Sequence, residues 1–268
     1  MYRKSKVDAF ALLERVRRSK PVIHHLTNWV TIYDCANVVK TLGASPVMAH
    51  APEEAAEMSA IADALVLNIG TLTVDLVESM KLAAKSANAK GIPVILDCCG
   101  AGATPLRDRA CADLLGGVRV DVIKGNASEI ARVSGMKVST KGVDSSEVSG
   151  DLAVIAKSFS AKRKCTVVIT GKEDFVAGGD TVYIVSNGDP MMGRIVGTGC
   201  MAASVIGTFC AVEKDYALAA CCGLVCFEVA GELAARSAKG TGSFKEKLFD
   251  HLYTLGAATV RRMQKVSA

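Results

Sequence analysis

A glycine turn that ends in a cysteine, Gly197-Thr198-Gly199-Cys200, is the part of the chain best suited to chemistry. An apolar, alanine-rich run, MAASVIGTFCAV, begins at the next residue, so the segment predicts a tight turn that opens a helix. The first N–H groups of a helix lack intrahelical partners and carry partial positive charge, which suits an anion such as a phosphoryl group. Cys200 stands where a reactive side chain would face that anion. A plain glycine turn before a core helix fits the same residues.

Polar and glycine residues also occur where most of the apolar, strand-like runs stop. The set comprises Asn28, Asn68, Gly70, Asp97, Lys124, Asn126 and Thr170, and Met48 lies near the end of another of these runs. In a parallel sheet the carboxyl ends of the strands lie at one edge, and ligands bind there. Each residue alone fits a turn or a helix cap, but together they predict a lined cleft.

Some of these positions suit a metal ion or a nucleotide. Asn126 and Glu129 fit a capping box at a helix start, and they equally fit oxygen groups that hold Mg²⁺ through water, with Asp97 as a further carboxylate. Lys124 fits a solvated loop lysine or a contact to nucleotide phosphates. The residue types alone leave both choices open.

Short apolar runs alternate with amphipathic ones, and these elements must position the polar groups. We expect strands over 22–26, 45–49, 64–69, 94–97, 120–124 and 166–170. We expect helices over 34–41, 52–62, 76–88, 105–115 and 129–133. A Gly-Gly-Asp turn predicts an edge hairpin over 174–188, and three helices follow, from 200, over 216–237 and over 243–264. Continuous apolar strands are typical of a parallel sheet buried on both faces, so we expect one three-layer α/β domain, 1–268, with a mostly parallel sheet.

The composition excludes several classes of partner. Half of the residues are hydrophobic, the net charge is only +5, and no basic tract contains aromatic residues, so we expect no nucleic acid partner. No apolar run reaches the length of a bilayer span and no signal peptide is recognisable, so we expect no membrane and a cytoplasmic location. The ten cysteines lack the spacing of a zinc site, and we expect reduced thiols.

Taken together, these segments resemble the hydroxyethylthiazole kinase family of the ribokinase-like superfamily. The matching stretches include 22–55, ALVLNIGTLT at 64–73, VILDCCGAGAT at 94–104, VIKGNASEI at 122–130, VVITGKEDFV at 167–176 and GTGCMAASVIGTF at 197–209. The resemblance implies a ribokinase-like fold and ATP-dependent phosphorylation of the hydroxyl of 4-methyl-5-(2-hydroxyethyl)thiazole, for thiamine phosphate synthesis. It also implies Mg²⁺ and a homotrimer that shares each substrate pocket between neighbouring subunits.

The same resemblance assigns roles to single residues. The thiazole pocket is expected to contain Asn28, Met48, Asn68, Gly70 and Gly197. The ATP contacts are expected at Lys124, Asn126 and Thr170. The acidic residues near Mg²⁺ are expected to be Asp97 and Glu129. The backbone that holds the charge of the phosphoryl group is expected to be that of Gly197, Thr198, Gly199 and Cys200.

The chain departs from the usual family pattern at two places. Lys124 stands where the family usually has arginine, which keeps the charge but loses the forked geometry. Cys98 and Cys99 stand where the family has proline and valine, which loosens that turn. In the wider superfamily an aspartate, as base, usually stands where this chain has Cys200. Because a loose transition state makes early deprotonation less necessary, we expect Cys200 to be a weak or dispensable base that mainly positions the hydroxyl.

Three other functions fit part of the pattern. They are a kinase for the pyrimidine alcohol of thiamine, a repair dehydratase of hydrated nicotinamide nucleotides, and a nucleotide-binding protein without catalysis. Assays with each substrate would separate them.

Overall fold

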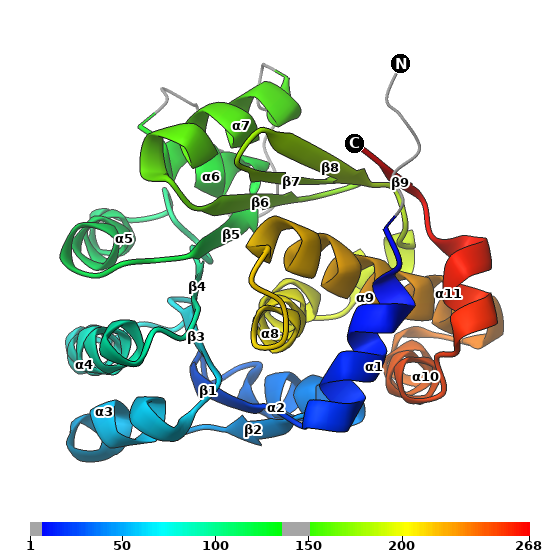
Figure 1. Ribbon diagram of the computed structural model, residues 1–268, viewed down its shortest axis with the longest axis horizontal. Coiled ribbons are helices and arrows are strands. Elements are labelled where there is room, and N and C mark those ends of the chain that lie inside the picture. The colour runs from blue at the N-terminus through cyan, green and yellow to red at the C-terminus, as the bar shows by residue number, and fades with distance from the viewer. Residues whose placement is uncertain (1–6, 136–150) are drawn as a thin grey trace.

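The computed structural model describes residues 7–135 and 151–268, whose strands form one sheet in the order β2-β1-β3-β4-β5-β6-β7-β8-β9 (Figure 1). The parallel strands are β1 (Val22–Leu26), β2 (Ser45–Val47), β3 (Ala64–Asn68), β4 (Val94–Asp97), β5 (Val122–Asn126) and β6 (Thr166–Thr170). The sheet continues antiparallel with β7 (Asp174–Gly178), β8 (Thr181–Val185) and β9 (Val266–Ser267). The expected α/β architecture with a mostly parallel sheet is confirmed.

Helices cover both faces of this sheet, as the alternation within the strands requires. Leu65 and Leu67 of β3 belong to one buried apolar cluster, and Val66 between them belongs to the other. The first cluster is covered by α3 (Pro52–Ile61), α4 (Val74–Lys90), α5 (Pro105–Gly117), α6 (Ala127–Val133) and α7 (Leu152–Arg163). The second is covered by α1 (Ala9–Ser19), α2 (Ile32–Thr41), α8 (Thr198–Cys210), α9 (Tyr216–Ser237), α10 (Thr241–Tyr253) and α11 (Ala257–Met263). Figure 1 shows α3, α4 and α5 on the left of the sheet and α8 and α9 on its other side.

The helix boundaries follow from local chemistry. Thr104 caps α5 by accepting a hydrogen bond from a backbone N–H, and the proline that follows it begins the helix, where a missing N–H costs nothing. Thr73 caps α4 in the same way, and Gly91 ends that helix at φ +80°, a conformation that favours glycine. Such caps place each helix start beside the end of the strand before it.

The C-terminal part differs from the sequence prediction in two places. The helix expected over 243–264 is two helices, α10 and α11, and Gly256 stands in extended conformation before the second. The short strand β9 pairs with β8 and forms this edge of the sheet. The prediction that the hairpin of β7 and β8 lies at the edge is therefore wrong. The strand expected over 120–124 lies at Val122–Asn126, which places Lys124 inside it.

Helix α9 passes the length and hydropathy test for a membrane span, which corrects the expectation that no segment would. The share of the tested window that is buried inside the fold is 83%. Figure 1 places α9 beside α8 and the sheet. It is therefore a central core helix, and its apolar residues are used in packing.

Candidate active site

The glycine turn opens α8 as the sequence predicts. Gly197 is the residue before the helix and has φ +98°, and a Cβ atom there would lie 2.7 Å from Cγ2 of Thr31. Both facts require glycine at this position. The hydroxyl of Thr198 donates to the carbonyl of Met192 at 2.9 Å and fixes the first turn. Because the leading N–H groups of a helix have no partner within it, this end presents donors to the space in front of α8.

Cys200 is buried and sits among hydrogen-bond donors. The side-chain amide of Asn28 donates to its Sγ atom at 3.1 Å. The thiol of Cys99, which hydrogen-bonds to Cys200, lowers the pKa of Cys200 most; Thr31, the ammonium of Lys124 and Asn28 add to the lowering. Burial opposes them, but the pKa still falls to about 5. The groups around Cys200 thus favour its thiolate form, and a thiolate with a lowered pKa is a weaker base.

Asn28 links Cys200 to the ends of two strands. Its second amide N–H donates to Oδ1 of Asn68 at 3.0 Å, and the amide of Asn68 donates to Oδ2 of Asp97 at 2.7 Å. The backbone N–H of Gly70 also donates to Asn68, at 2.8 Å. A Cβ atom at Gly70 would come within 2.8 Å of the Asn28 amide, so only glycine lets the two loops meet. The structure thus brings Asn28, Asn68, Gly70 and Asp97 together.

Lys124 pairs with Asp97 in the interior of the protein. Its Nζ atom lies 3.3 Å from Oδ1 of Asp97, and the two side chains are 5% and 1% exposed. Burial raises the pKa of Asp97 to about 8, and the ammonium of Lys124 works against that rise. Burial lowers the pKa of Lys124, but Asp97 and Glu129 outweigh it and hold that pKa above its ordinary value. A Cβ atom at Gly199 would lie 3.2 Å from Nζ, so this buried cation lies beside the start of α8 and is not the solvated loop lysine that the sequence allowed.

Asn126 and Glu129 form a capping box at the start of α6. The Asn126 side chain accepts from the N–H of Glu129 at 2.9 Å, and Oε2 of Glu129 accepts from the N–H of Asn126 at 2.7 Å. Oε1 of Glu129 accepts from the N–H of Gly100 at 2.7 Å. The capping interpretation of these two residues is confirmed. The role near Mg²⁺ stays a prediction, because both oxygens of Glu129 already accept backbone hydrogen bonds.

An arginine that the sequence analysis missed holds the two loops beside Asp97. The guanidinium of Arg107 donates to the carbonyls of Ile69 and Cys99, each at 2.8 Å, and to that of Gly70. Gly100 has φ +78°, and a Cβ atom there would lie 2.9 Å from Arg107. Arg107 thus fixes the turn at Cys98 and Cys99, where the chain lacks the proline that the family usually has. No sequence signal marked Arg107, because its partners are backbone atoms far along the chain.

Met48 lies next to the Asn28 loop without a direct bond to it. The carbonyl of Met48 is 3.0 Å from Nδ1 of His50, and Nε2 of His50 accepts from the N–H of Thr27 at 3.3 Å. The ring of His50 stacks on Trp29 with centroids 4.8 Å apart. His50 therefore joins the Met48 segment to the segment that carries Asn28.

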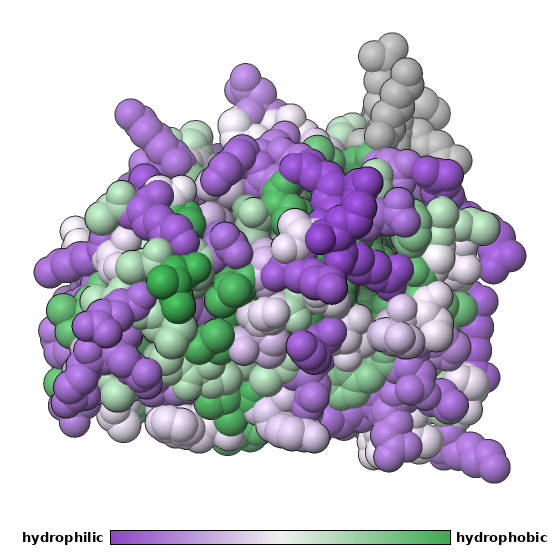
Figure 2. Space-filling model, turned by 60° about the horizontal axis from the view of Figure 1, so that its bottom comes forward, coloured by the Kyte–Doolittle hydropathy of each residue, from purple (hydrophilic) through white to green (hydrophobic). Residues whose placement is uncertain are grey.

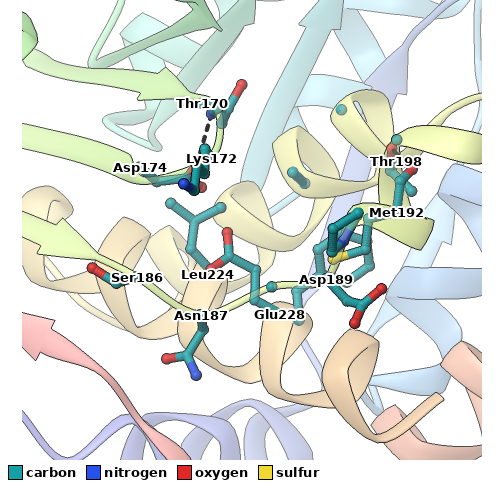
Figure 3. A pocket seen from close by; sticks show the side chains of 17 residues that line it. Thr170, Lys172, Asp174, Ser186, Asn187, Asp189, Met192, Thr198, Leu224 and Glu228 are labelled. Atoms are coloured by element: carbon teal, nitrogen blue, oxygen red, sulfur yellow. Dashed lines mark hydrogen bonds between the residues drawn. The ribbon is translucent and has the colours of Figure 1, made fainter. Parts of the chain in front are cut away.

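A cavity of about 600 Å³ opens beside the first turn of α8 (Figure 3). Thr198 and Gly199 line one end of it, and Thr170 lines it from the end of β6. The rest of the lining was not predicted from the sequence. It comes mainly from 186–190, 192 and 193, which take in part of the 3₁₀ helix η1 (Pro190–Arg194), and from Leu224, Phe227 and Glu228 of α9. Gly171, Lys172, Asp174 and Ala202 complete the lining.

Comparison with known proteins agrees with this geometry. A family model described as the hydroxyethylthiazole kinase family matches residues 13–258. The chain belongs to the hydroxyethylthiazole kinase family. A curated hydroxyethylthiazole kinase from Methanosarcina mazei is 54% identical over 254 residues, which cover 95% of this chain and 97% of that protein.

Solved structures agree with the family and the fold. The structure of hydroxyethylthiazole kinase from Pyrococcus horikoshii superposes with a TM-score of 0.86 at 38% identity, over 96% of this chain and 97% of that one. A ribokinase-like superfamily protein from Enterococcus faecalis has a TM-score of 0.62 at 16% identity, over 94% and 89% of the two chains, and shows the fold alone. The resemblance to the hydroxyethylthiazole kinase family and the ribokinase-like fold are both confirmed.

Proposed function

We propose that this member of the hydroxyethylthiazole kinase family phosphorylates the hydroxyl of 4-methyl-5-(2-hydroxyethyl)thiazole with ATP, for thiamine phosphate synthesis. One observation carries the proposal: the N-terminus of α8 lies between the 600 Å³ cavity and the buried group of Asn28, Cys200 and Asp97. A nucleotide on one side and an alcohol on the other would meet at the donors of that helix end. The whole chain, 1–268, acts in this proposal as one kinase domain.

In this arrangement the triphosphate extends from the cavity toward Thr198 and Gly199, and Thr170, Asn126 and Lys124 support the nucleotide. The thiazole alcohol occupies the other side of α8. It is bounded there by Asn28, Met48, Asn68, Gly70 and Gly197. Support comes from Lys124, whose buried ammonium lies beside Gly199 and can face a phosphate without leaving Asp97.

The protein's share of the chemistry is positioning and charge stabilisation. The hydroxyl attacks the γ-phosphorus in line, and the leaving group is the ADP oxygen opposite. The N–H groups at 197–200 hold the charge that develops, an arrangement worth about 10²–10³ in rate per donor. The Cys200 thiolate accepts a hydrogen bond from the alcohol and orients it. Its lowered pKa makes it a poor proton acceptor.

The residues present fit a hydrated Mg²⁺. Asp97 and Glu129 supply hard oxygen donors, and their existing hydrogen bonds leave them best suited to hold water ligands of the ion. Within residues 7–135 and 151–268, no group of three or more His, Cys, Asp or Glu side chains forms a metal cage. When bound with the nucleotide, the ion would neutralise the phosphate charge.

We further propose a homotrimer with the thiazole pocket between subunits, in the cytoplasm. Trp29, Val30, Tyr33 and Val196 are apolar yet more than half exposed, and Val196 precedes the glycine that packs on Thr31. These four residues, which we name the Trp29 patch, lie beside the substrate-side loops. Figure 2 shows one face on which apolar side chains gather among hydrophilic ones. The ten cysteines form no disulfide, which suits a reducing compartment.

A coupled ADP-release assay tests the function. ADP release should depend on the thiazole alcohol and on Mg²⁺. The pyrimidine alcohol of thiamine and hydrated NADH, which probe the kinase and dehydratase alternatives, should give no turnover. If ADP is not released with the thiazole alcohol, the proposed function is wrong; ATP binding without turnover on any alcohol would indicate a non-catalytic protein.

A further inference from the structure

Glu228 is an acidic residue in the wall of the cavity that nothing in the proposed chemistry uses. It lies within the apolar helix α9, its side chain is only 7% exposed, and it lines the cavity. Its Oε2 atom is buried without a hydrogen-bond partner among the residues that the structure describes. Figure 3 shows Glu228 extending from α9 toward the part of the cavity where Asp174 lies.

Asp174 is the acidic neighbour of Glu228 in the cavity wall. Burial raises the pKa of Glu228 well above its ordinary value, and the neighbouring Asp174 carboxyl, to which Glu228 hydrogen-bonds, raises it further. Asp174 also accepts from the N–H of Gly171 at 2.9 Å. The raised pKa favours the protonated form of Glu228, whose O–H can donate to Asp174. The remaining oxygen of Glu228 is left as a neutral, carbonyl-like acceptor.

A second glutamate, Glu232, lies one turn further along α9 and differs from Glu228 in its hydrogen bonds. Oε1 of Glu232 accepts from the Asn187 amide at 2.9 Å, from the N–H of Gly188 at 3.2 Å and from Lys265 at 2.9 Å. Glu232 is similarly buried, at 8% exposed, but its Oε1 atom has these three donors. Leaving a buried acceptor unpaired costs free energy, so native proteins rarely do so without a reason.

The position of Glu228 in the cavity indicates which part of a ligand would supply the missing donor. Thr198 and Gly199 mark the end that suits phosphates. Leu224 and Phe227, which precede Glu228 on α9, add apolar surface to the lining. Apolar surface beside a few convergent polar groups is typical of a site for a small molecule or cofactor. An uncharged acceptor suits an N–H or O–H donor there and does not repel the triphosphate.

We propose that Glu228 is a specificity-determining residue: its oxygen that does not engage Asp174 accepts a hydrogen bond from the nucleoside part of ATP, either from the base amine or from a ribose hydroxyl. This proposal rests on the proposed function, because it takes the cavity as the ATP site. Asp174 acts as the positioning residue, since its hydrogen bond orients the Glu228 carboxyl group.

Nucleotide analogues that lack one donor each test the proposal. Purine riboside triphosphate lacks the base amine, and 2′-deoxy-ATP and 3′-deoxy-ATP each lack one ribose hydroxyl. The wild type, Glu228→Gln and Glu228→Met are compared by kcat/KM and by the dissociation constant from calorimetry. Glu232→Gln is the matched control, because it changes a buried glutamate of the same helix outside the cavity lining. Thermal unfolding confirms that each variant is folded.

The wild type should prefer ATP over one of the three analogues by roughly 5- to 100-fold, the range for a hydrogen bond to a buried polar group. The analogue that is used or bound less well than ATP identifies which group of ATP donates the hydrogen bond to Glu228. Glu228→Gln retains an oxygen acceptor and should keep the preference, whereas Glu228→Met should reduce it to within about threefold. Glu232→Gln should keep it. Equal use of all three analogues by the wild type, or an unchanged preference in Glu228→Met, would overturn the proposal.

The role of Glu228 can be tested even if the proposed kinase function is wrong. If no alcohol is phosphorylated, calorimetry with ATP and the same analogues still measures the preference, and it supports or overturns the role of Glu228 independently of turnover.

Discussion

At the scale of single residues, the amide of Asn28 does most to define the site. Both of its N–H groups are used, one on Cys200 and one on Asn68, while its oxygen accepts from the N–H and the hydroxyl of Thr31 at 3.1 and 3.0 Å. With all these positions filled, its orientation is fixed. The thiolate that it holds is thereby kept at a constant distance from the turn before α8.

Replacing Cys200 tests whether it takes a proton. Cys200→Ala should lower kcat by no more than about 10²–10⁴-fold, the range for a general base, because the donors of α8 remain. Cys200→Asp should stay active, since it places the superfamily's usual carboxylate there. Steady-state kinetics with a binding measurement for the thiazole decide the question. A folded Cys200→Ala protein that binds substrate without any turnover would contradict the weak-base role.

Cys99 is predicted to control the ionisation of Cys200. Cys99→Val removes the hydrogen bond that lowers the Cys200 pKa most, so that pKa should rise above its value of about 5. The thiolate absorbance near 240 nm, titrated against pH in Cys99→Val and in Cys99→Val with Cys200→Ser, isolates the change. Cys165→Ser is the control, since Cys165 lies outside the site, at the end of α7 away from Cys200. An unmoved titration midpoint would mean that Asn28 and Lys124 alone stabilise the thiolate.

At the scale of elements, the site depends on where helices start and which of their residues are polar. Helix α8 starts at a glycine that no other residue can replace without strain, and α9 carries two buried acids with different surroundings. The start of α8 presents backbone N–H groups, and α9 presents two carboxyl groups, at defined positions of otherwise apolar helices.

Gly197→Ala should destabilise the protein and lower its catalytic rate. The left-handed backbone costs a non-glycine residue about 1–2 kcal/mol, and the new methyl group meets Thr31 at 2.7 Å. Thermal unfolding and kcat should both fall. Gly116→Ala in α5 is the matched control: no atom lies within 4 Å of a Cβ there, so its stability should hold or rise slightly. Equal stability of the two variants would show that the turn tolerates a side chain.

Glu228→Gln should stabilise the protein in a pH-dependent manner. The native pKa of Glu228 is raised above its ordinary 4.5, so the folded state keeps a proton that the unfolded state releases, and the wild type loses stability as pH rises above about 4.5. The variant lacks this loss. Its advantage in unfolding free energy should be small near pH 4.5 and larger at pH 7–8, as measured by urea unfolding. An advantage that shrank toward pH 8 would contradict a protonated Glu228.

At the scale of the whole molecule, the sequence predicted the sheet and the loops at its carboxyl edge. Continuous apolar runs are clear signals, and parallel strands bring their ends together, so Asn28, Asn68 and Asp97 met as expected. The cavity lining from α9 was not predictable, because Glu228 in an apolar run appears only as an interruption of that run. The contacts of Arg107 and the ion pair of Lys124 with Asp97 were not predictable either, since sequence periodicity carries no information about partners on other segments.

The Trp29 patch should hold the proposed trimer together. Tyr33→Asp places a charge in the patch and should convert a particle of three 28.0 kDa chains into smaller species, with loss of thiazole affinity. Light scattering coupled to size exclusion measures the mass. Ile61→Asp on α3 is the control, since Ile61 is also well exposed but lies on the helix layer of the opposite face, and it should leave the mass unchanged. A monomeric wild type would contradict the assembly.

The strand β9 has a consequence for solubility. It is only two residues long, but it pairs with β8 at the free side of the sheet. Without it, β8 would present a row of unpaired backbone groups, which is a template for uncontrolled pairing with another molecule. Val266 and Ser267 therefore help to protect the protein from aggregation through β8. A purification tag is better fused at the N-terminal end of the chain.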